Sequence, residues 1–122
     1  MAPRVLVVDD NRSNRELMLY LLRAFGYDAE GAADGLLGFD AAREGAFDLI
    51  LVDILMPGID GYEFARRCKA DPALVSTPIV AVTALAMAGD RERILAAGLN
   101  GYIPKPIDPE RLRAEIEELI SG

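Results

Sequence analysis

Five polar side chains stand directly after short apolar runs of this sequence: Asp9, Asp10, Asp53, Thr83 and Lys105. Carboxylates gathered at one place repel one another and raise each other's pKa, so they are stable there only with a compensating cation. Oxygen ligands without His or Cys nearby favour Mg²⁺ over zinc. Carboxylates, Mg²⁺, a hydroxyl and an ammonium group together are typical of phosphoryl transfer. The sequence holds two lysines against eleven arginines, so a lysine at this place indicates a specific role.

These side chains meet only if the apolar runs before them are neighbouring parallel strands. The runs Val5–Val8 and Leu49–Val52 are apolar without alternation, a pattern of strands buried on both faces. Pro78–Val82 and the shorter Gly101–Ile103 are further strands, and the weakly apolar Tyr27–Ala32 is an edge strand. In parallel sheets, ligands bind outside the carboxyl ends of the strands, where all the polar groups above would lie.

Helical patterns follow each predicted strand. We expect helices over residues 11–25, 35–44, 60–70 and 86–97, and a last helix from Asp108-Pro109 onward. Strands alternating with helices of 10 to 15 residues indicate right-handed βαβ units. The sequence therefore predicts the α/β class, with a doubly wound five-stranded parallel sheet in a flavodoxin-like (βα)5 arrangement and one domain over residues 1–122.

Apolar spacing predicts the buried helix faces. In the first helix the predicted face is Leu17, Leu21 and Phe25, widened by Met18 and Leu22. In the second helix, Gly38 opposes helix formation, because glycine there costs on the order of 1 kcal/mol relative to Ala. Its Leu37 is either a core residue, the interpretation we favour, or an exposed docking contact.

Composition excludes several function classes. A net charge of −7 argues against a nucleic-acid or anionic-membrane surface. The absence of His removes the commonest general base and any histidine phosphocarrier role. The single Cys68 excludes an internal disulfide framework and fits a reducing compartment. Neither a bilayer-spanning run nor a signal peptide is expected, so we predict a cytoplasmic protein.

Four motifs in order resemble the receiver domains of two-component response regulators, the CheY-like family. They are Val7-Val8-Asp9-Asp10-Asn11, Asp53 to Gly61, Val82-Thr83-Ala84 and Tyr102-Ile103-Pro104-Lys105-Pro106. The resemblance covers residues 4 to 121. The segment Thr83 to Arg91 is similar to a subgroup that includes stand-alone DivK-type regulators and the receivers of hybrid histidine kinases.

The resemblance implies that Asp53 accepts a phosphoryl group from a sensor histidine kinase or a histidine phosphotransfer protein. Asp10, Asp53 and the backbone carbonyl of Leu55 would bind Mg²⁺ directly, with Asp9 acting through water. The expected output is a change in binding to a downstream protein target, and a phosphorylation-dependent homodimer is a further arrangement left open.

The resemblance also assigns the switch residues. Lys105 would pair with the phosphoryl oxygens, with its bond to Pro106 expected to be cis. Thr83 would move to bond the phosphoryl group, and Tyr102 would then rotate inward. For Thr83 and Tyr102 the alternatives are a strand-end hydroxyl bonded to the backbone and a half-buried packing aromatic.

Departures from the family pattern carry their own expectations. Leu37 and Gly38 stand where many relatives have a Glu-Ala pair. The pocket positions two residues after Asp53 and after Thr83 are both leucine, Leu55 and Leu85. Bulky apolar groups there would hinder an in-line water, so we expect an acyl phosphate that is not especially short-lived.

Two other functions remain as alternatives. A small Mg²⁺-dependent aspartyl phosphotransferase or phosphatase would usually place a second acid two residues after its nucleophile, where this chain has Leu55. A phosphorylation-independent interaction module would not need the complete set Asp10, Asp53, Thr83 and Lys105.

Overall fold

The computed structural model describes residues 2–84 and 88–121 and contains five parallel strands in one sheet. The strands are β1 (Arg4–Val8), β2 (Asp28–Ala32), β3 (Leu49–Asp53), β4 (Ile79–Thr83) and β5 (Gly101–Pro104). Their spatial order is β2-β1-β3-β4-β5. This sheet confirms the predicted doubly wound topology, with the weakly apolar β2 at one edge.

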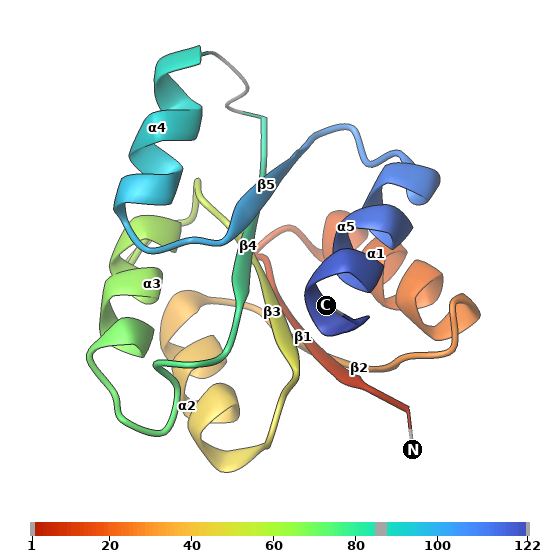
Figure 1. The fold of residues 1–122 in the computed structure, drawn as a ribbon, viewed down its shortest axis with the longest axis horizontal. Coiled ribbons are helices and arrows are strands. Elements are labelled where there is room, and N and C mark those ends of the chain that lie inside the picture. The colour runs from red at the N-terminus through yellow and green to blue at the C-terminus, as the bar shows by residue number, and fades with distance from the viewer. Residues whose placement is uncertain (1, 85–87, 122) are drawn as a thin grey trace.

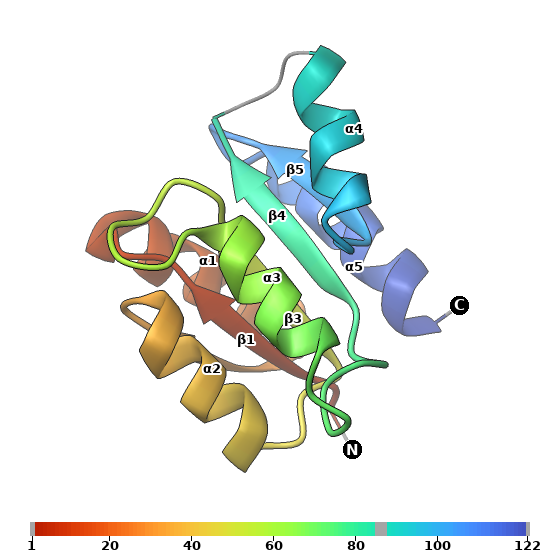
Figure 2. The same ribbon diagram turned by 90° about the vertical axis from the view of Figure 1, so that its left-hand side faces the viewer.

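A helix follows each strand, as the sequence pattern predicts. The helices are α1 (Arg12–Ala24), α2 (Gly35–Glu44), α3 (Gly61–Lys69), α4 (Ala88–Ala96) and α5 (Pro109–Ser121). Helices α1 and α5 cover one face of the sheet, and α2, α3 and α4 cover the other (Figures 1 and 2). The sheet is therefore buried on both faces, and β3 and β4 accordingly have no polar residue before their last position.

Alternate strand residues supply two separate apolar cores. One contains Leu6, Val8, Ile50 and Val52 beneath α2 and α3, and the other contains Val5, Val7, Leu49 and Leu51 beneath α1 and α5. The members of each list are fully buried. The period of two along a strand sends successive side chains to opposite faces, so a continuous apolar run serves both cores.

The buried face of α1 differs from the prediction. Met18 and Leu22 are buried, whereas Leu17 is 44% exposed. Leu21 and Phe25 are only partly buried at the margin of the core. The face is thus rotated toward Met18 and Leu22, and the prediction for Leu17 is wrong, because apolar spacing fits two adjacent faces of this leucine-rich helix equally well.

Helix α2 is explained by close packing at Gly38. A Cβ at Gly38 would lie 2.7 and 2.8 Å from the two methyl carbons of Val8, so no larger residue fits without movement. The intrinsic cost of glycine in the helix is offset by this close approach to β1. Leu37, the residue before Gly38, is 54% exposed, and the favoured interpretation of it as a core residue is wrong.

The first three helices begin at the carboxyl ends of the strands, each with a side-chain cap. Asn11, Asp34 and Asp60 accept hydrogen bonds from the backbone N–H groups three residues later, at 2.8 to 2.9 Å. Within the described residues, no helix is both long and apolar enough to cross a lipid bilayer. The predicted start of the fourth helix at Ala86, and Leu85 before it, lie outside the described residues.

Candidate functional site

The carboxyl edge of the sheet brings together the polar groups that the sequence places after separate strands. Asp9 follows β1, Asp53 ends β3, and β1 and β3 are hydrogen-bonded neighbours. Carboxylate oxygens of Asp9, Asp10 and Asp53 lie within 4.8 Å of one another. Residues more than 40 positions apart therefore form one acidic cluster.

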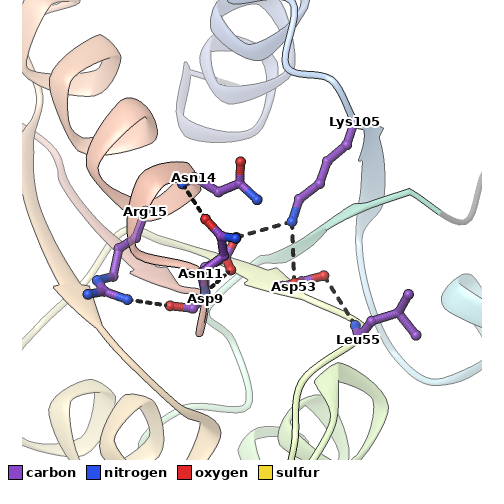
Figure 3. A network of polar contacts seen from close by, with 7 residues as sticks. All are labelled: Asp9, Asn11, Asn14, Arg15, Asp53, Leu55 and Lys105. Atoms are coloured by element: carbon purple, nitrogen blue, oxygen red, sulfur yellow. Dashed lines mark hydrogen bonds and ion pairs between the residues drawn. The ribbon is translucent and has the colours of Figure 1, made fainter.

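Lys105 supplies the positive charge of this cluster. Its Nζ lies 3.3 Å from Asp9 Oδ2 and 3.3 Å from Asp53 Oδ2 (Figure 3). Lys105 follows β5, its backbone N–H donates to the carbonyl of Thr83 at 2.9 Å, and its bond to Pro106 is cis. One ammonium group thus contacts two carboxylates that arrive from different strands.

Asp9 has every polar group engaged and is fully buried. Its backbone N–H donates to the carbonyl of Ala32 at 3.1 Å, and its own carbonyl accepts from Arg15 Nη1 at 2.8 Å. Its Oδ1 accepts from the N–H of Asn11 at 2.9 Å, while Oδ2 faces Lys105. The carboxylate of Asp9 is therefore held in one place by both neighbours in sequence and distant residues.

Asp10, its neighbour, is exposed. Among the described residues, no group donates a hydrogen bond to the Asp10 carboxylate and no cation pairs with it. Two adjacent aspartates thus occupy different environments, one fixed and one open to a ligand.

The Asp53 carboxylate shares the Lys105 ammonium with Asp9 and is nearly buried. Its Oδ1 accepts from the N–H of Leu55 at 3.1 Å. Burial is the main cause that raises the pKa of Asp53 above its ordinary value, and the negative charge of Asp9 adds to it. The positive charge of Lys105 and the hydrogen bond from Leu55 act in the opposite direction.

The turn after Asp53 depends on a glycine that approaches the backbone. A Cβ at Gly61 would lie 2.8 Å from the carbonyl oxygen of Asp53 and 2.8 Å from Cα of Ile54. Its N–H donates to the carbonyl of Ile54 at 3.0 Å. Gly61 therefore closes the loop that carries Leu55, whose side chain is 57% exposed beside the charged cluster.

Thr83 and Tyr102 lie on the neighbouring strands β4 and β5. Thr83 ends β4 and is fully buried. Tyr102, on β5, is half-buried, with the guanidinium carbon of Arg111 at 5.7 Å from its ring centroid. The structure thus places a buried hydroxyl and a half-buried aromatic ring on adjacent strands near Lys105.

The structure gives supporting roles to Arg15, which sequence reasoning missed, and to Gly61, which the motif after Asp53 already contains. Arg15 bonds the Asp9 carbonyl from α1, and Gly61 makes room for the backbone of Asp53. The close spacing of Gly58 and Gly61 after Asp53 indicates a tight loop. Nothing in the sequence indicates the contact of Arg15, because a long side chain on a helix can reach many positions.

Comparison with known proteins gives consistent findings. The family model described as "Response regulator receiver domain" matches residues 5–117. The chain is 41% identical over 120 residues to the polar-differentiation response regulator DivK of Brucella anthropi, covering 98% of each chain. In the part of the chain that the comparison spans, there is no large insertion or missing segment.

Solved structures agree. The receiver domain of the sensor histidine kinase PA1611 from Pseudomonas aeruginosa PAO1 superposes with a TM-score of 0.92 at 34% identity, covering 100% of each chain; that structure has a magnesium ion coordinated in its active site cleft. The chemotaxis response regulator CheY4 of Vibrio cholerae superposes with a TM-score of 0.92 at 31% identity, covering 98% of this chain and 99% of that one.

Proposed function

The chain belongs to the family of response regulator receiver domains of two-component signalling, and we propose that Asp53 is the residue that accepts the phosphoryl group. The family role is that of a signalling phosphoacceptor. The observation that carries the assignment is that the Asp53 carboxylate pairs with Lys105 and lies beside two further aspartates, at the carboxyl end of the central strand. We also assign residues 1–122 to a single receiver domain.

In the transfer step, an Asp53 carboxylate oxygen forms a bond to phosphorus as the bond from phosphorus to the donor's imidazole nitrogen breaks. The imidazole keeps the electron pair of that bond. Lys105, at 3.3 Å from Asp53 Oδ2, can turn to the phosphoryl oxygens and pair with their charge. The product is an acyl phosphate on Asp53.

The acidic cluster fits a magnesium ion, because three carboxylates offer oxygen atoms within 4.8 Å of one another. We assign Asp10, Asp53 and the backbone carbonyl of Leu55 as direct ligands, with Asp9 acting through water. This assignment is supported by the environment of Asp9, whose two carboxylate oxygens already accept hydrogen bonds. When bound, Mg²⁺ supplies positive charge that offsets the carboxylates and the transferred group.

Thr83 and Tyr102 are our candidates for the switch. The Thr83 hydroxyl moves to donate to the phosphoryl group, and Tyr102 moves inward. Their placement on adjacent strands beside Lys105 supports this role. Phosphorylation adds about two negative charges and strong acceptor oxygens, enough to favour a new arrangement of these side chains.

Receiver domains interact with histidine kinases and downstream targets. For this chain we propose a sensor histidine kinase or histidine phosphotransfer protein as donor and a protein as target, with neither nucleic acid nor membrane bound directly. One hollow between α4, β5 and α5 is lined by Arg111, Glu115 and Glu118. These opposite charges could pair between two copies of the chain, which supports a homodimer formed on phosphorylation. The buried free thiol of Cys68 supports a cytoplasmic location.

Phosphotransfer from a panel of histidine kinases of the source organism tests the assignment of Asp53. The wild-type chain is expected to gain one phosphoryl group from its cognate donor, and Asp53→Asn is expected to gain none. Asp48→Asn is a matched control, because Asp48 precedes the same strand at its other end and accepts a hydrogen bond from the Arg4 N–H. Transfer to Asp53→Asn at the wild-type rate would contradict the assignment.

We propose that the chain catalyses only its own phosphorylation and dephosphorylation. The exposed side chain of Leu55 beside Asp53 supports a product that is not especially short-lived, as bulky apolar groups hinder an attacking water. Multiple turnover of an added phosphomonoester would instead support a phosphatase. The predicted lifetime is tested by measuring the half-life of the acyl phosphate after treatment with a small-molecule phosphodonor. Leu55→Asn is expected to shorten this half-life.

A further inference from the structure

One charged side chain beside the acidic cluster has no part in the transfer step described above. Arg15, on the first turns of α1, directs Nη1 to the backbone carbonyl of Asp9 at 2.8 Å (Figure 3). It is half-buried, and its guanidinium contacts a carbonyl and not a carboxylate of the cluster. Its role is therefore not that of a simple counter-charge.

The carbonyl of Asp9 belongs to the same planar peptide unit as the N–H of Asp10. A hydrogen bond that fixes this carbonyl also fixes the rotation of the peptide plane, and with it the direction in which the chain enters Asp10. The Asp10 carboxylate is exposed and makes no hydrogen bond of its own within residues 2–84 and 88–121. Its position thus depends on its backbone.

A glycine of β2, Gly31, leaves room for the Arg15 side chain to reach this carbonyl. A Cβ at Gly31 would lie 3.1 Å from Cδ and 3.2 Å from Cγ of Arg15. Gly31 has no positive φ, so backbone conformation does not require glycine there. The space left by the missing side chain is filled by the stem of Arg15 and by Leu19.

From this geometry we propose that Arg15 is a positioning residue for the metal site: it orients the Asp9–Asp10 peptide so that the Asp10 carboxylate faces Mg²⁺. Gly31 contributes to this positioning, because the absence of a side chain there leaves space for the apolar stem of Arg15. The inference rests on the proposed function, since it takes Asp10 as a metal ligand. Groups that hold metal ligands in place typically contribute about 10- to 100-fold to metal affinity.

The sign of the effect separates positioning from electrostatics. Removing a positive charge close to an acidic cluster strengthens cation binding if charge alone matters. Loss of a positioning contact weakens it. Arg12 is a matched control on the same helix, because it is exposed and lies closer to Asp10 in sequence. Its only ion pair within residues 2–84 and 88–121 is with Glu16, at 2.9 Å.

The experiment is a calorimetric titration of the whole chain with Mg²⁺ alone, together with thermal unfolding of each metal-free variant. Arg15→Met keeps the apolar stem and removes the donor, and we expect its Mg²⁺ affinity to fall about 10-fold. Arg15→Lys keeps one donor and should recover part of that loss. Gly31→Ala should weaken binding less than Arg15→Met, and Arg12→Met should leave it unchanged or slightly tighter.

A purely structural role of Arg15 would lower the unfolding temperature and leave the Mg²⁺ affinity of the folded chain unchanged, and that result overturns the inference. Equal weakening in Arg12→Met and Arg15→Met would also overturn it. If the wild-type chain itself does not bind Mg²⁺, the proposed metal site fails, and this result is distinct from the failure of Arg15 alone. Should Arg15→Met not fold, Arg15→Lys and Gly31→Ala still decide the question.

Discussion

The two ends of the sheet hold similar charges in different surroundings. At the amino end, Arg4 contacts Asp28 at 3.3 Å and Glu30 at 2.6 Å, and its backbone N–H donates to Asp48. At the carboxyl end, Lys105 lies among Asp9, Asp10 and Asp53. Each end thus places three carboxylates near a cationic side chain, and at the carboxyl end Arg15 bonds the Asp9 carbonyl as well.

Solvent exposure separates the two ends. The side chains of Asp28 and Glu30 are 59% and 56% exposed, whereas those of Asp9 and Asp53 are 0% and 8% exposed. Water solvates the excess negative charge at the amino end, so exposed pairs there contribute little. At the carboxyl end the charge is shielded from water and calls for a cation or a reaction partner. Burial, and not composition, distinguishes the functional end.

Replacing the cation at each end should give the largest difference in stability. Lys105→Met leaves buried carboxylates without their partner, and we expect a loss of about 3 kcal/mol in the metal-free chain. Arg4→Met breaks exposed pairs and should cost about 1 kcal/mol or less from their charges. Urea unfolding at neutral pH measures the free energy of unfolding of both variants. Equal losses would contradict the difference in burial between the two ends of the sheet.

Mg²⁺ should stabilise the carboxyl end alone. A ligand at 100 times its dissociation constant stabilises a folded chain by about 2.7 kcal/mol. We expect this gain for the wild type and for Asp28→Asn, and a much smaller one for Asp10→Asn, which lacks a proposed ligand. Thermal unfolding with and without Mg²⁺ measures the gain, and its persistence in Asp10→Asn would argue against that ligand.

Without metal, removing one carboxylate should have opposite effects at the two ends. Asp10→Asn relieves repulsion from carboxylates within 4.8 Å, and we expect a gain of about 1 kcal/mol, because Asp10 itself is exposed to water. Asp28→Asn removes an exposed partner of Arg4 and should be neutral or slightly destabilising. Chemical unfolding in a metal chelator compares the two variants.

The smallest effect concerns pH. Burial, the main cause, and the charge of Asp9 raise the pKa of Asp53, so the folded chain binds this proton more tightly than the unfolded chain. The resulting stability is complete below the unfolded pKa and is lost as pH rises through the folded pKa. Because Lys105 opposes the shift, the change should be modest.

Asp53→Asn cannot ionise at this position, so its stability relative to the metal-free wild type should increase as pH rises through that window and then level off. Unfolding free energies measured across a series of acidic to neutral buffers test this expectation. A constant difference between the two chains at every pH would contradict it. Added Mg²⁺ should reduce the dependence, because it favours the ionised carboxylate.

Much of the site was predictable because each of its charged residues follows a recognisable strand. The uninterrupted apolar runs before Asp9 and Asp53 require burial on both faces, and parallel strands bring their carboxyl ends to one edge. Lys105 was identifiable by its place between two prolines after the last strand. These inferences need only the local pattern and a general rule of topology.

Other features depend on packing between distant segments. The pattern of α1 fits either of two adjacent faces, and only contact with the sheet buries Met18 and leaves Leu17 exposed. From the sequence alone, Gly38 only destabilises α2, whereas in the folded chain it allows α2 to pack closely against Val8. Asp9 and Asp10 are identical in type, so the sequence does not tell which one is buried.

The order of strands and helices, the parallel sheet and the residue types at its carboxyl edge can all be derived from the sequence, because they follow from the period of apolar side chains and from where the apolar runs end. Three contacts are known from the folded chain alone: Lys105 pairs with Asp9, Arg15 bonds the carbonyl of Asp9, and the stem of Arg15 packs against Gly31. These contacts join α1, β1, β2 and the segment after β5, and their geometry is set by how those elements pack, which no local pattern encodes.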